Sequence, residues 1–205
     1  MTIYTIGHSN YPVEKLIDML RAYNIDTVVD IRGTPYSKYN VQYNKETIEY
    51  TLKSEGFIYI YMAEELAAKR IKKVSYNKEG YADFEKVINE EGFIKGIERL
   101  KKGCGKGYKI ALLGAMQEPI RCHRSILCGR ALRDAGFEVK HILDDYSTCS
   151  QEEIEKMILD KYFPNRAQIT IDSLLGEGMD EEEMIKSAYR KANREIGYRI
   201  ENIKD

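Results

Sequence analysis

The run RCHRS at 121–125 places cationic side chains, a thiol and an imidazole next to one another. It falls at the start of a helix predicted for residues 122–135, where unpaired backbone amides and the helix dipole attract anions. Arg121 and Arg124 add positive charge, so we predict that Arg124 and Cys122 help to bind a phosphate, sulfate or carboxylate. The same field favours a thiolate at Cys122. The alternatives are a solvated salt bridge for the arginines and a buried, inert Cys122.

A cysteine-dependent phosphatase would need an arginine six positions after its cysteine, and this spacing is not found here. The residue six positions after Cys122 is Cys128, and the residue six positions after Cys128 is Asp134. Cys128 shares a predicted helix face with Leu132, so we expect it in the core.

The chain has three histidines, and two of them are candidate catalytic residues. Imidazole titrates near neutral pH, so His8 and His123 could act as general acids or bases. Gly7 beside His8 permits a close approach. The alternative is that each makes only structural hydrogen bonds, which is what we expect of His141 inside a predicted strand.

Asp30 and Arg32 lie two residues apart at the end of the second predicted strand, so their side chains point to the same face. Asp30 is a candidate catalytic residue that would orient an imidazole or hold a cation, and Arg32 is a candidate anion ligand. A structural ion pair is the alternative, because unpaired charge at the end of a buried strand is costly.

The loop from 33 to 44 is rich in Gly, Pro, Ser and Asn and also carries Tyr36, Lys38, Tyr39 and Tyr43. Aromatic and basic side chains of this kind can stack on a base and contact a phosphate. The chain contains 16 tyrosines, so clustering by chance is common. Nucleic-acid binding is therefore one interpretation among others.

The elements that must position these residues alternate along the chain. A helix is expected after Asn10 as N-cap with Pro12 at its first position, and the helix at 122–135 ends at Gly136. The helix at 81–100 is weakened by its glycines, Gly92 and Gly96. The apolar runs predict strands at 3–7, 27–31, 57–62, 108–114 and 137–143, and the other helices are expected at 45–54 and 150–161.

Strands that alternate with helices predict right-handed crossovers and a mainly parallel sheet. We therefore predict an α/β fold for residues 1–163, a three-layer sandwich with about five strands. The run at 57–62 lacks polar alternation, which predicts burial on both faces, and 67–80 is expected to be an irregular surface segment. Ligands of such sheets bind beyond the carboxyl ends of the strands, where the candidate residues lie.

The tail at 164–205 is more polar and is expected to form a helical C-terminal extension. Asp180 and Glu183 fit a capping box for a helix from 181 to about 200. Its apolar stripe predicts packing on the main domain or on a second subunit, so a homodimer through this helix is possible.

The composition of the chain disfavours several classes of protein. The chain has 205 residues, 32 Lys+Arg and 33 Asp+Glu, hence a net charge of -1, which disfavours a dedicated non-specific nucleic-acid binder. No run approaches about 18 apolar residues and the N-terminus lacks signal-peptide features, so we expect a cytoplasmic protein without membrane association. The four cysteines have no CxxC pair and are expected to be free thiols.

The sequence resembles the domain of unknown function 488 family over about residues 1–145. TIGHSN, VDIRGTPYS followed by QYNKE, and EPIRCHRSILCGRALRDAGFEVKHI carry the resemblance. It implies a compact α/β domain of unestablished activity, loosely linked to nucleic-acid metabolism. The positions that it marks are His8, Ser9, Asn10, Asp30, Arg32, Pro35, Ser37, Asn44, Cys122, His123 and Arg124.

Two departures from the family pattern bear on activity. The family usually has Cys-Ala-Glu after the fourth strand and Leu-Gly-Gly after the third. This chain has Gly114-Ala115-Met116 and Leu66-Ala67-Ala68 instead. A thiol and a carboxylate are therefore missing, so either the family activity does not need them or this member has altered it.

These residues support two main hypotheses. The first is an enzyme acting on a phosphate-bearing substrate, a nucleotide or nucleic acid, with Arg32, Arg124, Ser9, Ser37, Asn44 and Cys122 as anion ligands and His8, His123 and Asp30 as catalytic groups. The second is a non-catalytic module that binds an anion or a nucleotide. A mononuclear metal site is a third alternative, although no local metal-binding motif supports it and no cofactor is indicated.

Overall fold

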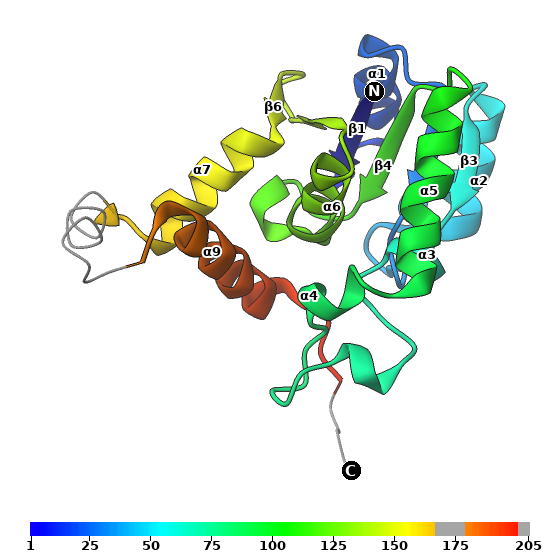
Figure 1. Ribbon diagram of the computed structural model, residues 1–205. Coiled ribbons are helices and arrows are strands. Elements are labelled where there is room, and N and C mark those ends of the chain that lie inside the picture. Colours follow the sequence, from blue (N-terminus) through cyan, green and yellow to red (C-terminus); the bar gives the residue numbers. More distant parts are fainter. Residues whose placement is uncertain (167–178, 201–205) are drawn as a thin grey trace.

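The computed structural model describes residues 1–166 and 179–200, in which a six-stranded sheet is flanked by helices (Figure 1). The strand order is β3-β2-β4-β1-β5-β6. The first five strands along the chain are parallel, whereas β6 pairs with β5 in the antiparallel direction. The strands are β1 (Thr2–Gly7), β2 (Thr27–Asp30), β3 (Ile58–Tyr61), β4 (Ile110–Gly114), β5 (Glu138–Ile142) and β6 (Thr148–Ser150).

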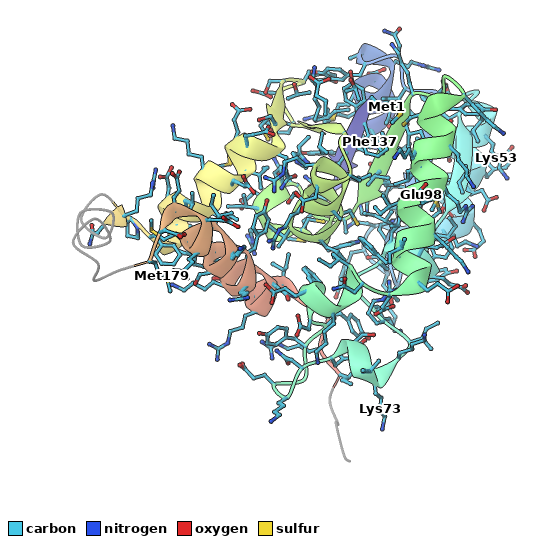
Figure 2. All side chains as sticks on the ribbon, viewed as in Figure 1. Met1, Lys53, Lys73, Glu98, Phe137 and Met179 are labelled. Atoms are coloured by element: carbon cyan, nitrogen blue, oxygen red, sulfur yellow. The ribbon has the colours of Figure 1, made fainter. Side chains whose placement is uncertain are left out.

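Helices cover both faces of the sheet, which confirms the predicted α/β sandwich. One face packs on α1 (Val13–Ala22) and α2 (Lys45–Ser54) through residues such as Leu16 and Leu52. The other face packs on helices that include α5 (Glu91–Gly105) and α7 (Gln151–Tyr162), and side chains fill the space between the layers (Figure 2). The remaining helical elements are η1 (Val41–Tyr43), α3 (Ala63–Leu66), η2 (Lys73–Ser75), α4 (Phe84–Val87), η3 (Pro119–Arg121), η4 (Arg124–Gly129), α6 (Arg130–Asp134) and α9 (Glu181–Ile196).

The sheet differs from the sequence prediction at both edges. β2 and β4 are buried along their whole length, but β3 is an edge strand and the side chain of Ile58 is 43% exposed. The prediction that this strand is buried on both faces was therefore wrong, because only β2 pairs with it. The short β6 was not predicted, since three residues are too few to show a periodic pattern.

The helix predicted for 81–100 is two helices, α4 and α5, which are separated at residues 88–90. The break does not fall at its glycines. It falls where Glu90 becomes the N-cap of α5 and pairs with Arg70, their atoms 2.6 Å apart. Arg70 is buried, so the segment 67–80 is irregular as predicted but does not lie wholly at the surface.

Two helix starts differ from those expected. Pro12 is the N-cap of α1, which begins at Val13, so Asn10 does not cap it. The helix predicted for 122–135 begins at Arg124, and its first half, η4, is a π-helix. Single π-helical turns widen the backbone and are often found at functional sites. Gly136 follows this helix with φ of 87°, as expected of a left-handed C-terminal cap.

The C-terminal helix α9 packs beside α7 (Figure 1). Asp180 caps it by accepting a hydrogen bond from the amide of Glu183, and Met184 and Tyr189 are buried on its inner side. The helix ends at Ile196, before the predicted residue 200, because the chain turns away at Gly197. None of the described helices has the length and apolar character that crossing a membrane requires.

A buried polar network gives His141 the structural role that the sequence suggested. Its Nδ1 lies 2.7 Å from Oγ1 of Thr5 and its Nε2 lies 2.9 Å from Oε1 of Gln151. An amide oxygen only accepts, so Nε2 carries the proton. Burial, together with the charge of Arg124, lowers the pKa of His141 to about 3.

Gly7 lies where β1 and β4 end, in a space too small for any side chain. A Cβ there would lie 1.8 Å from the carbonyl oxygen of Met116 and 2.7 Å from Nη1 of Arg124. We expect Gly7→Ala to lower the free energy of unfolding by about 3 kcal/mol, because backbone must move. Gly92→Ala is the matched control, because a Cβ there meets nothing within 4 Å. Its free energy of unfolding should equal that of wild type or exceed it by up to about 1 kcal/mol. Equal unfolding midpoints in urea would contradict this prediction.

Candidate functional site

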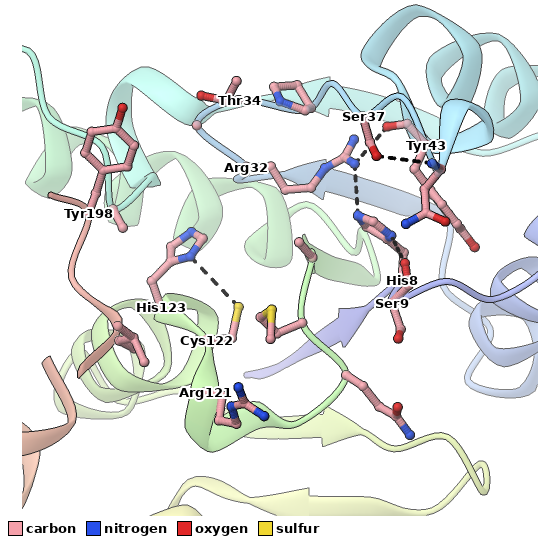
Figure 3. A pocket seen from close by; sticks show the side chains of 18 of the residues that line it. His8, Ser9, Arg32, Thr34, Ser37, Tyr43, Arg121, Cys122, His123 and Tyr198 are labelled. Carbon is pink, nitrogen blue, oxygen red and sulfur yellow. Dashed lines mark hydrogen bonds between the residues drawn. The ribbon is translucent and has the colours of Figure 1, made fainter. Parts of the chain in front are cut away.

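A pocket of about 960 Å³ opens at the carboxyl edge of the parallel strands, and Figure 3 shows it from close by. Its walls come from the ends of β1, β2 and β4, from the loop after β2 and from the end of α9. Six of the nine candidate site residues line it: His8, Ser9, Arg32, Ser37, Cys122 and His123. The other three, Asp30, Asn44 and Arg124, do not.

Asp30 holds Arg32 in place through a buried ion pair. One carboxylate oxygen accepts from Nε of Arg32 at 2.9 Å and the other accepts from Nη2 at 2.6 Å. The hydroxyl of Tyr59 donates to the same carboxylate at 2.8 Å. Asp30 is fully buried and Arg32 is only 6% exposed. Asp30 therefore orients an arginine rather than an imidazole, and it does not face the pocket.

Arg32 in turn engages His8. Its Nη1 donates to the carbonyl oxygen of Tyr43 at 2.8 Å and lies 3.1 Å from Nε2 of His8. Nδ1 of His8 lies 2.7 Å from the carbonyl oxygen of Ser9, which can only accept. The proton is therefore on Nδ1, and Nε2 accepts from Arg32. The ring also stacks on that of Tyr43, with centroids 4.0 Å apart.

The environment of His8 keeps its imidazole neutral. Burial and the adjacent charge of Arg32 lower the pKa of His8 to about 4. With Nε2 accepting from Arg32, no lone pair of the ring is free for a substrate proton. His8 thus lines the pocket but is placed to position Arg32, so its predicted acid-base role is not supported by the geometry.

Cys122 and His123 form a thiol and imidazole pair at the pocket (Figure 3). Nε2 of His123 donates to the carbonyl oxygen of Ile31 at 3.0 Å, just beyond β2. This bond fixes the ring, so that Nδ1 faces Sγ of Cys122 at 3.9 Å. A nucleophile, a base and a group that orients the base are the parts that covalent catalysis requires.

Arg124, a predicted anion ligand, does not line the pocket, because its side chain points into the protein. Its guanidinium donates to the carbonyl oxygens of Met116 and Gln117, and the residue is fully buried. Its Nε has no hydrogen-bond partner, and no carboxylate pairs with it in the described part of the chain. A buried cation without a carboxylate strongly favours a nearby anion.

Ionisation of the Cys122 thiol would supply such an anion. Burial alone would raise the pKa of this thiol, but the charge of Arg124, the hydrogen bond between Cys122 and His123 and the backbone amide of Arg124 outweigh it. Together they lower the pKa of Cys122 to about 6. The sequence had left open whether this cysteine is reactive or inert, and the geometry favours a reactive one.

We therefore expect Cys122 to be alkylated by iodoacetamide with a rate that rises with pH and reaches half its plateau near pH 6. The thiolate is the reacting form, so the profile follows its pKa. Mass spectrometry should follow each site separately, because Cys104 is partly exposed, whereas Cys122 is a buried residue of the pocket wall, 4% exposed. Burial raises the pKa of Cys104, which makes it an internal control. His123→Gln should move the Cys122 midpoint upward; a wild-type midpoint above pH 8 would contradict the assignment.

Ser37 and Asn44 fix the shape of the loop after β2. Oδ1 of Asn44 accepts from the amide of Ser37 at 2.7 Å, and Oγ of Ser37 accepts from the amides of Tyr39 and Asn40 at 3.1 Å each. Asn44 therefore shapes the loop from outside the pocket. The nearby Ser9 lines the pocket with a left-handed backbone, φ of 48°.

Several pocket residues could not be identified from the sequence. Arg121 is exposed at the pocket, whereas its sequence position indicated only a positive charge. Glu118 and Glu195 bring negative charge, and Glu195 pairs with Lys161 at 2.5 Å. Lys69, Ile196 and Tyr198 come from segments far apart in the chain. No sequence signal links these positions, because only folding brings them to the same place.

The alternative of a mononuclear metal site finds no support in the geometry. Within residues 1–166 and 179–200, no three His, Cys, Asp or Glu side chains gather as metal ligands would. Asp30 and His8, whose side chains are of types that bind metals, already contact Arg32.

The fold and the site define a class: an α/β protein with a mostly parallel sheet and a thiol and imidazole pair in a pocket at its carboxyl edge. A family described as a domain of unknown function, DUF488, matches residues 12–131. The chain belongs to this family, as its motifs suggested. No curated protein and no solved structure matches the chain.

Proposed function

We propose that this protein is an enzyme that uses the Cys122 thiolate as a nucleophile on a phosphate-bearing substrate. The observation that carries the proposal is the pair formed by Cys122 and His123, with its imidazole fixed by the carbonyl oxygen of Ile31. Cysteine catalysis needs a thiolate near neutral pH, and the buried charge of Arg124 supplies one. Arg124 thus acts on the thiolate and not on the substrate.

The reaction would proceed in two steps. First the Cys122 proton passes to Nδ1 of His123. The thiolate then attacks phosphorus, the bond to the leaving oxygen breaks, and the His123 imidazolium returns the proton to that oxygen. In the second step His123 takes a proton from water, whose oxygen attacks phosphorus and displaces the Cys122 thiolate, which is released unchanged. The net reaction is hydrolysis of a phosphate ester.

Although Glu118 and Glu195 bring negative charge to the pocket, its wall also carries cations that suit an anionic group. Arg121 is exposed at its wall, and no ion pair involving Arg121 is found in the described residues. Arg32 faces the same space, although Asp30 balances its charge. An arginine fork binds phosphate oxygens bidentately, so Arg121 is the foremost anion ligand in this proposal.

The test is a screen for phosphate release from phosphomonoesters, nucleotides and short single-stranded nucleic acids, with wild type and Cys122→Ser side by side. We expect release by wild type alone and slower alkylation of Cys122 when inorganic phosphate is present. Equal release by both proteins would refute the role of Cys122. Alkylation unaffected by phosphate at any concentration would argue against an anion site beside the thiol.

A non-catalytic anion-binding or nucleotide-binding module is the second candidate. Both ring nitrogens of His8 already make hydrogen bonds, which leaves this imidazole no free nitrogen for proton transfer. In addition, Gly114 and Met116 stand where the family pattern has a thiol and a carboxylate. Saturable binding of a phosphate compound, measured by calorimetry, with no turnover in the same screen would establish this module instead.

The proposal extends to the cellular location and the oligomeric state of the protein. A thiolate nucleophile needs reducing surroundings, so a cytoplasmic location is the one that we propose. The four cysteines are free, which is consistent with such a location. A homodimer through the C-terminal helix stays a prediction, to be checked by the molar mass in solution.

A further inference from the structure

One wall of the pocket is built from two segments that lie far apart in the sequence. Ala68 and Lys69 come from the connection after α3, and Ile196 and Tyr198 come from the end of α9. Figure 3 places Tyr198 on the opposite side of the pocket from His8. Ile196 and Tyr198 lie beyond residues 12–131, the part that matches the family. We call these four residues the C-terminal wall.

Buried contacts fix the C-terminal wall in position. The side chain of Asn193, 5% exposed, donates to the carbonyl oxygen of Ala82 and accepts from the amide of Phe84, each at 2.9 Å. The amide of Ala82 donates to the carbonyl oxygen of Tyr198, also at 2.9 Å. The chain turns at Gly197, where a Cβ would lie 2.8 Å from the carbonyl oxygen of Asn193. These buried hydrogen bonds therefore fix the position of Tyr198.

The C-terminal wall presents an aromatic ring with a cation beside it. The Tyr198 ring is 38% exposed, and Nζ of Lys69 lies over it at 5.4 Å from its centroid. Glu195 is the acidic neighbour, and its carboxylate pairs with Lys161. Flat aromatic groups of a ligand stack on such rings, and each stacked nucleobase contributes on the order of 1–3 kcal/mol. The pocket, about 960 Å³, is large enough for a ring system and a phosphate together.

We infer that the C-terminal wall is a nucleobase-binding wall, with Tyr198 as the residue on which the base stacks and Arg121 beside Cys122 as the place of the phosphate. The ligand is then a nucleoside phosphate, either free or at the end of a single strand. This inference rests on the proposed function for its phosphate, and it adds the specificity of the same site. Tyr198 is a binding residue here, without a part in the chemical steps.

The test is calorimetry on Cys122→Ser, which binds without turnover, with adenosine 5′-monophosphate and ribose 5-phosphate as probes. We expect the nucleotide to bind more tightly than the sugar phosphate. Tyr198→Ala should weaken nucleotide binding about 5- to 150-fold, the effect of losing one stacked base, and leave ribose 5-phosphate unchanged. Tyr198→Phe keeps the ring and should restore binding. Tyr50→Ala, which removes a 76% exposed tyrosine outside the pocket, is the matched control and should change nothing.

The outcomes separate the two proposals. Equal binding of both probes, or nucleotide binding that Tyr198→Ala leaves intact, would overturn the nucleobase wall while the proposed function stands. No binding of either probe, together with no phosphate release by wild type, would overturn both. A 5′-phosphorylated single-stranded hexanucleotide distinguishes the sources: tighter, Tyr198-dependent binding than the mononucleotide identifies a strand end, and weaker binding identifies a free nucleotide.

Discussion

Cys122→Ser is expected to lower phosphate release by on the order of 10³-fold or more, because the attacking atom is lost and a serine hydroxyl is not ionised near neutral pH. The thiolate is the only side-chain nucleophile in the proposed reaction, so no other side chain takes its place. The effect should appear in kcat, while the dissociation constant for inorganic phosphate should change little. Initial rates of phosphate release at pH 7 measure it.

Two other cysteines provide the controls for this variant. Cys104 and Cys149 do not line the pocket, and burial raises the pKa of both thiols. Cys104→Ser and Cys149→Ser should therefore retain wild-type rates. Unfolding of Cys122→Ser in urea should resemble that of wild type, which separates lost chemistry from lost folding. If Cys104→Ser abolished release as completely as Cys122→Ser, the assignment of the nucleophile would be wrong.

Asp30→Asn is expected to lower the free energy of unfolding by about 3–5 kcal/mol, the cost of removing one partner of a buried ion pair. The substitution keeps the size of the side chain but leaves the positive charge of Arg32 buried without its carboxylate. The expected effect is large because Arg32 is 6% exposed, so water cannot replace Asp30. Urea unfolding at pH 7 measures the difference.

An exposed ion pair supplies the comparison. Glu55 pairs with Arg21 at 2.6 Å, and their side chains are 40% and 54% exposed. Glu55→Gln should cost less than about 1 kcal/mol, since solvent screens surface pairs. If Asp30→Asn cost no more than this control, Arg32 would have to find another partner or enough water in the folded protein. The alkylation profile of Cys122 gives a second readout of whether the site keeps its shape.

The fold was largely predictable because it depends on local patterns. Apolar runs of five to seven residues separated by amphipathic helices indicated β1 to β5 in order and a parallel sheet, and the structure has them. What the pattern could not give was each strand's place in the sheet. Ile58 and the buried Val29 lie in runs of similar composition, and only the partners on either side decide their exposure.

The candidate site was likewise predictable only in part. Its chemical groups were found from the sequence, because each follows a strand whose carboxyl end lies at one edge of the sheet. The roles of these groups could not be found in that way. Arg124 was predicted to bind an anion, but its guanidinium donates to backbone carbonyl oxygens. His8 was predicted to transfer protons, but its Nε2 accepts a hydrogen bond from Arg32. A side chain's direction depends on which neighbours satisfy its hydrogen bonds, and those neighbours are remote in the chain.

The sequence by itself determined the α/β class, the sheet edge where the pocket opens and the residue types gathered there, because hydrophobic periodicity and the order of elements along the chain are local properties. Only the tertiary structure decided that Cys122, and not His8, has the environment of a reactive group, and that Tyr198 lines the pocket. The physical reason is that burial and charge act through space. Arg124 changes the thiol of Cys122 only because folding places a cation without a carboxylate beside it.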